Sequence, residues 1–122
     1  MKLPSLLALG ALALAPTARA ADLSGLWIVS SSFAQTPVTL ECSLLQVGSA
    51  LTGWCEPQSA DAVPAALTGS LSQNNASWSY DLTVQGQPVR VAYQGTLAAD
   101  GDGMTGQLTY GTSSAGLTAA RK

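Results

Sequence analysis

The stretch from Ser77 to Gln94 has the sequence SWSYDLTVQGQPVRVAYQ, in which apolar and polar residues alternate. Its apolar positions are Trp78, Tyr80, Leu82 and Val84 and, after the turn signal Gln85-Gly86, Val89, Val91 and Tyr93. Successive side chains of a strand point to opposite faces of a sheet, so this pattern predicts two β-strands with one face in a core. Arg90 falls in the outward set, where we expect a solvated charge.

The rest of the chain has the same pattern and shows no sustained helical periodicity. The strands expected from it are Gly25 to Phe33, Pro37 to Val47, Ala50 to Glu56, Ala65 to Ser72, Ser77 to Val84, Pro88 to Leu97, Met104 to Tyr110 and Gly116 to Arg121. Eight consecutive strands joined by short turns favour an all-β fold, a single eight-stranded antiparallel up-and-down barrel, because closure removes exposed edges. A β-sandwich is the alternative. The longest connection, Glu56 to Pro64, is expected to be a surface loop.

The first twenty residues have the features of a bacterial secretory signal peptide. Lys2 precedes an apolar run from Leu6 to Ala15, which is too short to span a bilayer, and Pro16 to Ala20 end in a small-residue cleavage site. We expect cleavage after Ala20, giving a signal peptide (1–20) and one mature domain (21–122). The mature domain is expected to be periplasmic or secreted, with no membrane insertion; a retained membrane anchor is the alternative.

The charge of the mature domain excludes one class of partner. The full chain has five basic and seven acidic residues, and removal of residues 1–20 takes away Lys2 and Arg19, which leaves a net charge of −4. Binding to nucleic acid needs a cluster of Lys and Arg that displaces counterions from phosphates, and the chain has no such cluster. We therefore expect no nucleic-acid partner.

The two cysteines are expected to form a disulfide bond. Gly48-Ser49 is suited to a two-residue type II′ turn, and counting outward from it places Cys42 opposite Cys55. An even number of cysteines in an exported chain indicates a disulfide. A metal site is the alternative, but the sequence has no histidine and no second cysteine pair. Because the hairpin already closes the loop, we expect the bond to fix register more than to create the fold.

The two ends of the mature domain resemble a known group of barrels. Asp22 to Trp27 reads DLSGLW, with a Gly-x-Trp triplet, and the chain ends Leu117 to Lys122, LTAARK. This resembles the calycin group, which includes the lipocalins and avidins. The resemblance implies that Trp27 plugs one end of the barrel and that Arg121 packs across its ring, a cation–π contact of about 1 kcal/mol.

Two further resemblances extend beyond the ends. Phrases such as Leu51 to Gly53, Tyr93 to Thr96 and Asp102 to Gly106 resemble a widespread small secreted bacterial domain of unassigned function. The Ser24 to Trp27 phrase and the two cysteines resemble periplasmic inhibitors of secreted metalloproteases, which insert an N-terminal segment into the protease. Only Ala21 and Asp22 would precede the barrel here, which departs from the inhibitors' pattern.

The sequence supplies little catalytic chemistry. Without histidine, Ser-His-Asp and Cys-His arrangements and most zinc sites are excluded. Asp100 and Asp102 are the only closely spaced acids, and Asp100 to Gly103 is typical of a hairpin turn. Calcium binding there is the alternative, although the later ligands of an EF-hand loop are missing. We assign no catalytic residue, no metal and no cofactor.

The functional hypothesis concerns the barrel interior. Trp78, Tyr80, Tyr93 and Met104 are the candidate ligand-binding residues, which with Trp27 would line an apolar cavity open at one end. The alternative is that they fill the barrel. The leading expectation is a non-enzymatic exported barrel that binds a small, largely apolar ligand. A protein-binding or protease-inhibitor barrel comes second, and a cofactor-free isomerase or cyclase third.

Overall fold

The barrel consists of eight strands in chain order. The computed structural model describes residues 22–57 and 63–122, so the expected signal peptide, its cleavage site and the central part of the Glu56 to Pro64 connection lie outside the described residues. The strands are β1 (Gly25–Phe33), β2 (Thr36–Val47), β3 (Ala50–Pro57), β4 (Ala65–Ser72), β5 (Asn75–Val84), β6 (Gln87–Leu97), β7 (Gly103–Tyr110) and β8 (Ser113–Arg121). Within these ranges, no helix is long and apolar enough to cross a membrane.

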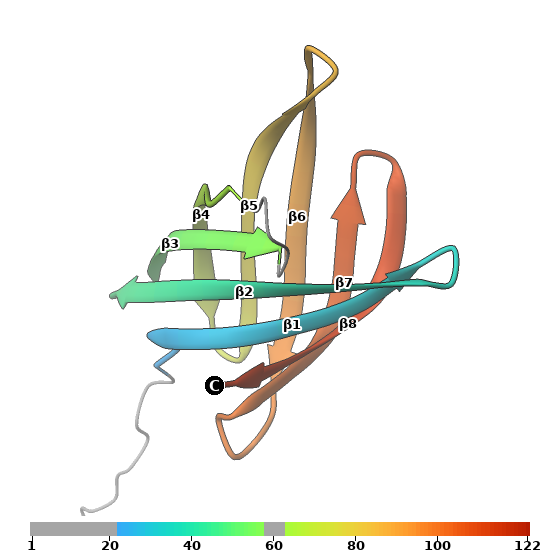
Figure 1. Cartoon of the computed structure of the whole chain (residues 1–122). Helices are drawn as coiled ribbons and strands as arrows, with labels where there is room; N and C mark the ends of the chain where they lie inside the picture. Colours follow the sequence, from blue (N-terminus) through green and yellow to red (C-terminus); the bar gives the residue numbers. More distant parts are fainter. Residues whose placement is uncertain (1–21, 58–62) are drawn as a thin grey trace, which may run out of the picture.

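Each strand pairs antiparallel with the next, and β8 pairs with β1 to close the barrel. Figure 1 shows β1 to β3 crossing β5 to β7 at a steep angle, as expected for the tilted strands of a small barrel. The predicted all-β fold and its closed, eight-stranded antiparallel form are confirmed, and the alternative sandwich is wrong.

The strand limits differ from the prediction by no more than three residues, and the turns explain the difference. β8 begins at Ser113 instead of Gly116, because Gly111 (φ 60°) and Thr112 form a tight turn after which Ser113 pairs with Tyr110. Likewise β5 begins at Asn75, which pairs with Ser72. After a two-residue turn, strand pairing begins with the next residue. The residues next to these turns are polar, so the sequence pattern did not predict that they belong to strands.

The β2–β3 hairpin has the predicted register. Val47 pairs with Ala50 across Gly48-Ser49, and Cys42 pairs with Cys55. Gly48 has φ 62°, as the first position of a type II′ turn requires. The Cys42–Cys55 disulfide bond is present, both cysteines are buried, and their Cα atoms are 4.0 Å apart. A buried disulfide suits an oxidising compartment outside the cytoplasm.

The interior of the barrel is built from alternate residues of every strand. On β5 these are Ala76, Trp78 and Tyr80, and on β6 they are Val91, Tyr93 and Leu97, all of them buried. Among the described residues, no polar or charged residue is fully buried apart from the two tyrosines. The predicted alternation therefore separates the core from solvent over most of this hairpin, but Val84, expected to face the core, lies next to the turn and is 37% exposed.

Gly106 allows the backbones of β6 and β7 to approach closely. Gly106 lies between the inward-facing Met104 and Leu108 and pairs with Gly95 on β6. A Cβ atom on Gly106 would overlap the Gln94 carbonyl, because the backbones of β6 and β7 approach closely there. Glycine in a strand interior commonly marks such a close approach of two backbones.

We therefore predict that Gly106→Ala lowers the free energy of unfolding by about 3 kcal/mol, because the strands must separate to admit the methyl group. Gly116→Ala on β8 is the matched control, since a Cβ there meets nothing nearer than the Gly106 carbonyl at 3.9 Å. Urea unfolding followed by circular dichroism measures both. Equal stability of the two variants would contradict the close approach at Gly106.

Candidate functional site

One end of the barrel is closed by the segment that precedes β1. Leu23 and Trp27 have no exposed surface, and the Trp27 indole Nε1 donates a hydrogen bond to the Leu23 carbonyl at 2.9 Å. The Leu23 amide in turn donates to the Gln46 side chain on β2 at 2.8 Å. These bonds fix the residues that precede β1 against the Trp27 indole and against β2 at this end of the barrel.

Arg121, at the end of β8, ties this plug to the rest of the barrel. Its guanidinium carbon lies 4.6 Å from the centre of the Trp27 ring, which is the contact that the calycin resemblance implies. It donates hydrogen bonds to the carbonyls of Ser24 and Asp22, both at 2.9 Å, and of Gly101 at 3.0 Å. It also forms an ion pair with Asp102 at 3.2 Å. One side chain thus connects β8, the N-terminal plug and the β6–β7 turn.

The other end of the barrel is open and holds a cavity of about 600 Å³. Strands β1 to β8 all contribute to its wall, and the contributing side chains are almost all apolar or aromatic. The lining residues are Phe33, Val38, Leu40, Cys55, Pro57, Val63, Ala65, Tyr80, Leu82, Val91, Tyr93, Leu108, Tyr110 and Ser113.

The exposure of the lining residues shows which of them lie deep. Tyr93 is 1% exposed and Leu108 is 2% exposed, whereas Tyr110 is 41% and Val63 74% exposed. The first pair therefore forms the inner end of the cavity and the second pair its rim. No Asp, Glu, Lys or Arg of residues 22–57 and 63–122 lines it.

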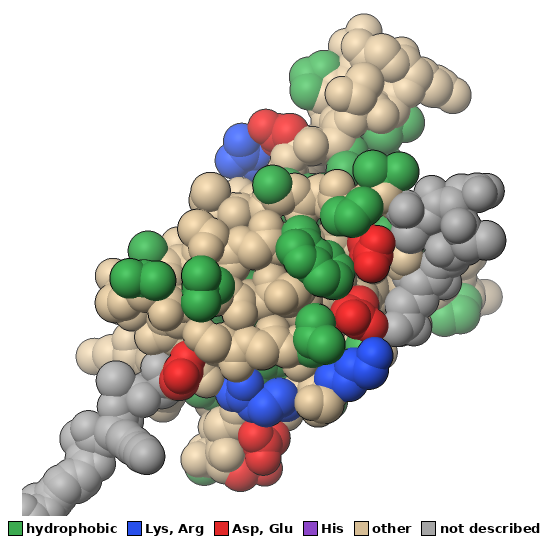
Figure 2. Space-filling view, turned by 60° about the vertical axis from the view of Figure 1, so that its left-hand side comes forward, with side chains coloured by type: hydrophobic (Ala, Val, Ile, Leu, Met, Phe, Trp, Pro, Cys, Tyr) green, Lys and Arg blue, Asp and Glu red, His purple; other side chains and the backbone are tan. Residues whose placement is uncertain are grey.

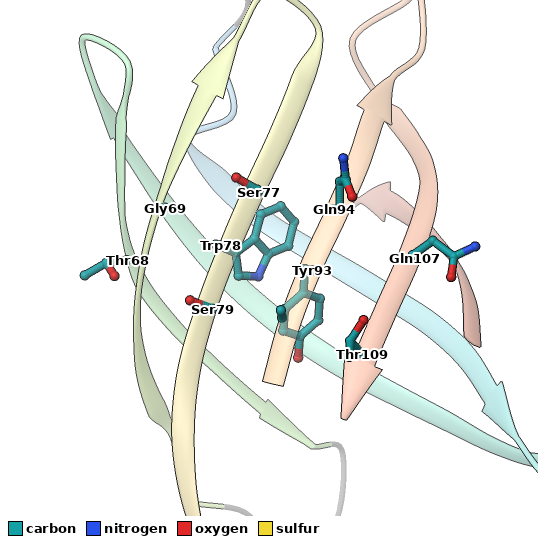
Figure 3. Close-up of a pocket in the computed structure, with 10 residues that line it drawn as sticks. Thr68, Gly69, Ser77, Trp78, Ser79, Tyr93, Gln94, Gln107 and Thr109 are labelled. Carbon is teal, nitrogen blue, oxygen red and sulfur yellow. The ribbon is translucent and has the colours of Figure 1, made fainter. Parts of the chain in front are cut away.

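Two tyrosines supply the polar atoms at depth. The Tyr80 and Tyr93 hydroxyl oxygens are 2.5 Å apart and share a hydrogen bond in which either can donate. The Tyr93 ring also stacks on the Trp78 indole, with ring centres 5.1 Å apart. Figure 3 shows these two rings side by side, with the Tyr93 hydroxyl directed away from Trp78.

Burial keeps this pair protonated. Burial raises the pKa of the Tyr93 hydroxyl far above its usual value, and the adjacent Tyr80 raises that pKa further. Burial also raises the pKa of Tyr80, and its hydrogen bond with Tyr93 lowers that pKa in part. Desolvation disfavours the charged form of a phenol, so both groups are neutral at physiological pH.

The four predicted ligand-binding residues have different positions. Tyr80 and Tyr93 line the open cavity, whereas Trp78 and Met104 are buried in the core and do not line it. Trp78 Nε1 is buried and has no hydrogen-bond acceptor in the described part of the chain. Several other residues also line the cavity and were not predicted from the sequence, although the inward alternation of their strands was a usable signal; they include Phe33, Val38, Leu40 and Leu108.

A second hollow, of about 280 Å³, has a different character (Figure 3). It lies over β4 to β7 and is lined mainly by polar side chains that alternate with the buried ones. Its lining residues are Thr68, Gly69, Ser77, Trp78, Ser79, Ala92, Tyr93, Gln94, Gln107 and Thr109. None of them carries a charge.

The charged side chains form hydrogen bonds in turns and ion pairs on the surface. The Asp102 amide donates to the Asp100 carboxylate at 2.9 Å within the β6–β7 turn, as expected for a hairpin turn. Arg90 is exposed and pairs with Asp81 at 3.0 Å, and this carboxylate raises the pKa of the guanidinium. Over the described ranges, no three His, Cys, Asp or Glu residues lie close enough together to hold a metal ion.

The chain was compared with protein-family models, with curated proteins and with solved structures, and it matches none of them significantly. The class that can be stated is therefore the one that the fold defines, a closed eight-stranded antiparallel barrel with one disulfide bond.

Arg121 and Arg90 form a matched pair for testing the closed end. We expect Arg121→Ala to lower the free energy of unfolding by about 2–3 kcal/mol, because it removes the Trp27 contact and three hydrogen bonds to carbonyls. Arg90→Ala removes an exposed ion pair and should cost less than about 1 kcal/mol. Urea denaturation of both variants gives the comparison, and an equal cost would mean that Arg121 is not the link between the plug and the barrel.

The raised pKa values of the tyrosine pair predict a loss of stability at high pH. The unfolded chain releases these protons near pH 10 while the folded barrel keeps them, so the pair's contribution is complete below about pH 10 and falls above it. The loss should approach about 1.4 kcal/mol per pH unit for each tyrosine that stays protonated. The measurement is urea unfolding between pH 9 and 11 of the wild type and of Tyr80→Phe/Tyr93→Phe. Parallel pH profiles would show that the pair ionises normally.

Proposed function

We propose that this barrel binds a small, largely apolar molecule in the cavity at its open end. The observation that carries the proposal is the cavity itself, which is about 600 Å³ in volume and is not lined by Trp27 or Arg121 of the closed end. Ligand pockets of proteins have volumes in this range and are lined mostly by apolar and aromatic groups with a few polar atoms. An eight-stranded barrel is just wide enough to hold one such ligand.

The closed end supports the same function. Leu23, Trp27 and Arg121 pack together at the far end, so within the described residues a ligand would enter from the cavity end. The entrance is bordered by Val63, Leu82 and Tyr110, whose apolar surfaces would otherwise face water. Transfer of an apolar molecule from water to this wall is favourable by about 25 cal/mol per Å² of buried surface.

Neighbouring alanines on β4 provide the test. Ala65 lines the cavity, whereas Ala66 is exposed on the outer face. Ala65→Phe should fill part of the cavity and weaken the binding of Nile red, a neutral apolar dye, by about tenfold or more, which corresponds to about 1.4 kcal/mol. Ala66→Phe should leave the affinity unchanged. Dye fluorescence measures the Kd, and circular dichroism confirms that both variants are folded.

Native mass spectrometry of protein purified gently from its host complements the dye. A bound molecule that is lost on denaturation would identify the natural ligand. Absence of dye binding by the wild type, or equal affinities of the two phenylalanine variants, would contradict the proposal.

A protein-binding role is the second candidate, and one observation favours it. Leu45 and Val47 on β2 are 55% and 69% exposed on the outer surface, and Leu26 on β1 is 36% exposed. Figure 2 shows hydrophobic side chains spread over the surface in separate groups among polar atoms. Asp22 and Leu23 are bonded to the closed end, so these two residues do not supply the free N-terminal arm of a protease inhibitor. A wild-type barrel that binds no apolar molecule would favour this second role.

A further inference from the structure

Only one of the two hydroxyl hydrogens of the tyrosine pair forms a hydrogen bond within the pair. The Tyr80 and Tyr93 hydroxyls have two hydrogens between them, and the bond that joins them uses one. No other hydrogen bond or ion pair within residues 22–57 and 63–122 involves either oxygen. Whichever hydroxyl donates to the other, the second hydrogen has no acceptor among the residues that the structure describes.

This spare donor lies deep in the cavity. Tyr80 is 7% exposed and Tyr93 is 1% exposed, and both line the cavity wall. A polar group that is buried without a partner costs free energy, and native proteins usually supply one from the protein, from water or from a ligand. The neighbours of the pair on this wall, Val91 and Leu108, have no side-chain acceptor.

The surroundings of the donor specify a neutral acceptor. A carboxylate or phosphate at this depth would need a cation to offset its desolvation, and the described wall contains none. The nearest cation along β6 is Arg90, which points to the outer surface and is paired with Asp81. Both phenols are protonated, as derived above, so they would not attract a cationic ligand.

We propose that the Tyr80–Tyr93 pair is a hydrogen-bonding subsite for an uncharged acceptor oxygen, and that the cavity therefore takes a neutral, apolar molecule with a carbonyl group at its leading end. This inference rests on the proposed function of the cavity and adds the chemical class and orientation of the ligand. The carbonyl lies at the inner end against the tyrosines. The hydrocarbon part extends past Leu82 and Phe33 towards Tyr110 at the rim.

Two probes of nearly the same shape separate the hydrogen bond from apolar burial. 2-Acetylnaphthalene has a ketone where 2-isopropenylnaphthalene has a CH₂ group, and 2-naphthoate replaces the ketone with a carboxylate. The wild type should bind the ketone about five- to tenfold more tightly than the alkene, which is the usual value of one neutral hydrogen bond. Naphthoate should bind more weakly than either. Isothermal titration calorimetry gives all three affinities.

Variants of the pair locate the preference. Tyr80→Phe/Tyr93→Phe should remove the preference for the ketone while the alkene still binds, because the ring packing remains. Tyr110→Phe is the control, because Tyr110 lines the same cavity at its exposed rim. Removal of its hydroxyl group should leave the ratio of the ketone and alkene affinities unchanged. The carbonyl stretching frequency of bound ketone should lie lower in the wild type than in the double variant, and lower than that of the ketone in a hydrocarbon solvent, which offers no donor. This infrared measurement on the wild type is informative even if the double variant does not fold.

The outcomes distinguish the two proposals. Equal affinity of the wild type for ketone and alkene, or an unshifted carbonyl frequency, would overturn the tyrosine subsite and leave the apolar cavity intact. A preference that disappears in Tyr110→Phe would place the donor at the rim and would also overturn it. Failure of both neutral probes to bind the wild type would overturn the proposed function itself. Tighter binding of naphthoate would contradict the neutral character of the subsite.

Discussion

The contacts of Arg121 determine which end of this barrel is open. A guanidinium on an apolar ring is stable only when its N–H groups also find acceptors, and here the Ser24, Asp22 and Gly101 carbonyls and the Asp102 carboxylate provide them. Those acceptors belong to the N-terminal plug and the β6–β7 turn, so one residue brings both against the same opening. The opposite opening has no such residue within the described ranges, and the cavity lies there.

Local patterns were sufficient to predict the strands. Period-two alternation identified all eight, and turn chemistry at Gly48-Ser49 fixed one register closely enough to pair Cys42 with Cys55. Strand starts were less well predicted. The β7–β8 turn is only two residues long, so β8 starts among the polar residues Ser113 and Ser114, whose composition indicates a loop. Hydrogen-bond pairing, which depends on the partner strand, outweighs the intrinsic preference of such residues.

Depth inside the barrel was not predictable from the same patterns. Alternation shows that Trp78, Tyr80, Tyr93 and Met104 all face inward, but only the two tyrosines reach the cavity. The depth of an inward-facing residue along the barrel axis depends on the tilt and stagger of the strands. Tilt and stagger follow from all eight strand pairings together. The tyrosine pair illustrates this point, because Tyr80 is paired with Val91 and meets Tyr93 only on the diagonal.

The pairing of β1 with β8 sets this fold apart kinetically from a simple series of hairpins. Seven of its eight pairings join neighbours in the chain, so each can form after a short loop closes, whereas the eighth joins Trp27 to Arg121. The entropy of bringing these distant segments together must be lost before the barrel gains its last ladder of hydrogen bonds. A barrel that lacked the β1–β8 pairing would be a curled sheet with two free edges, which are the sites where another chain can add a strand. The pairing of β1 with β8, which ends at Trp27 and Arg121, therefore removes the two edges at which chains could aggregate.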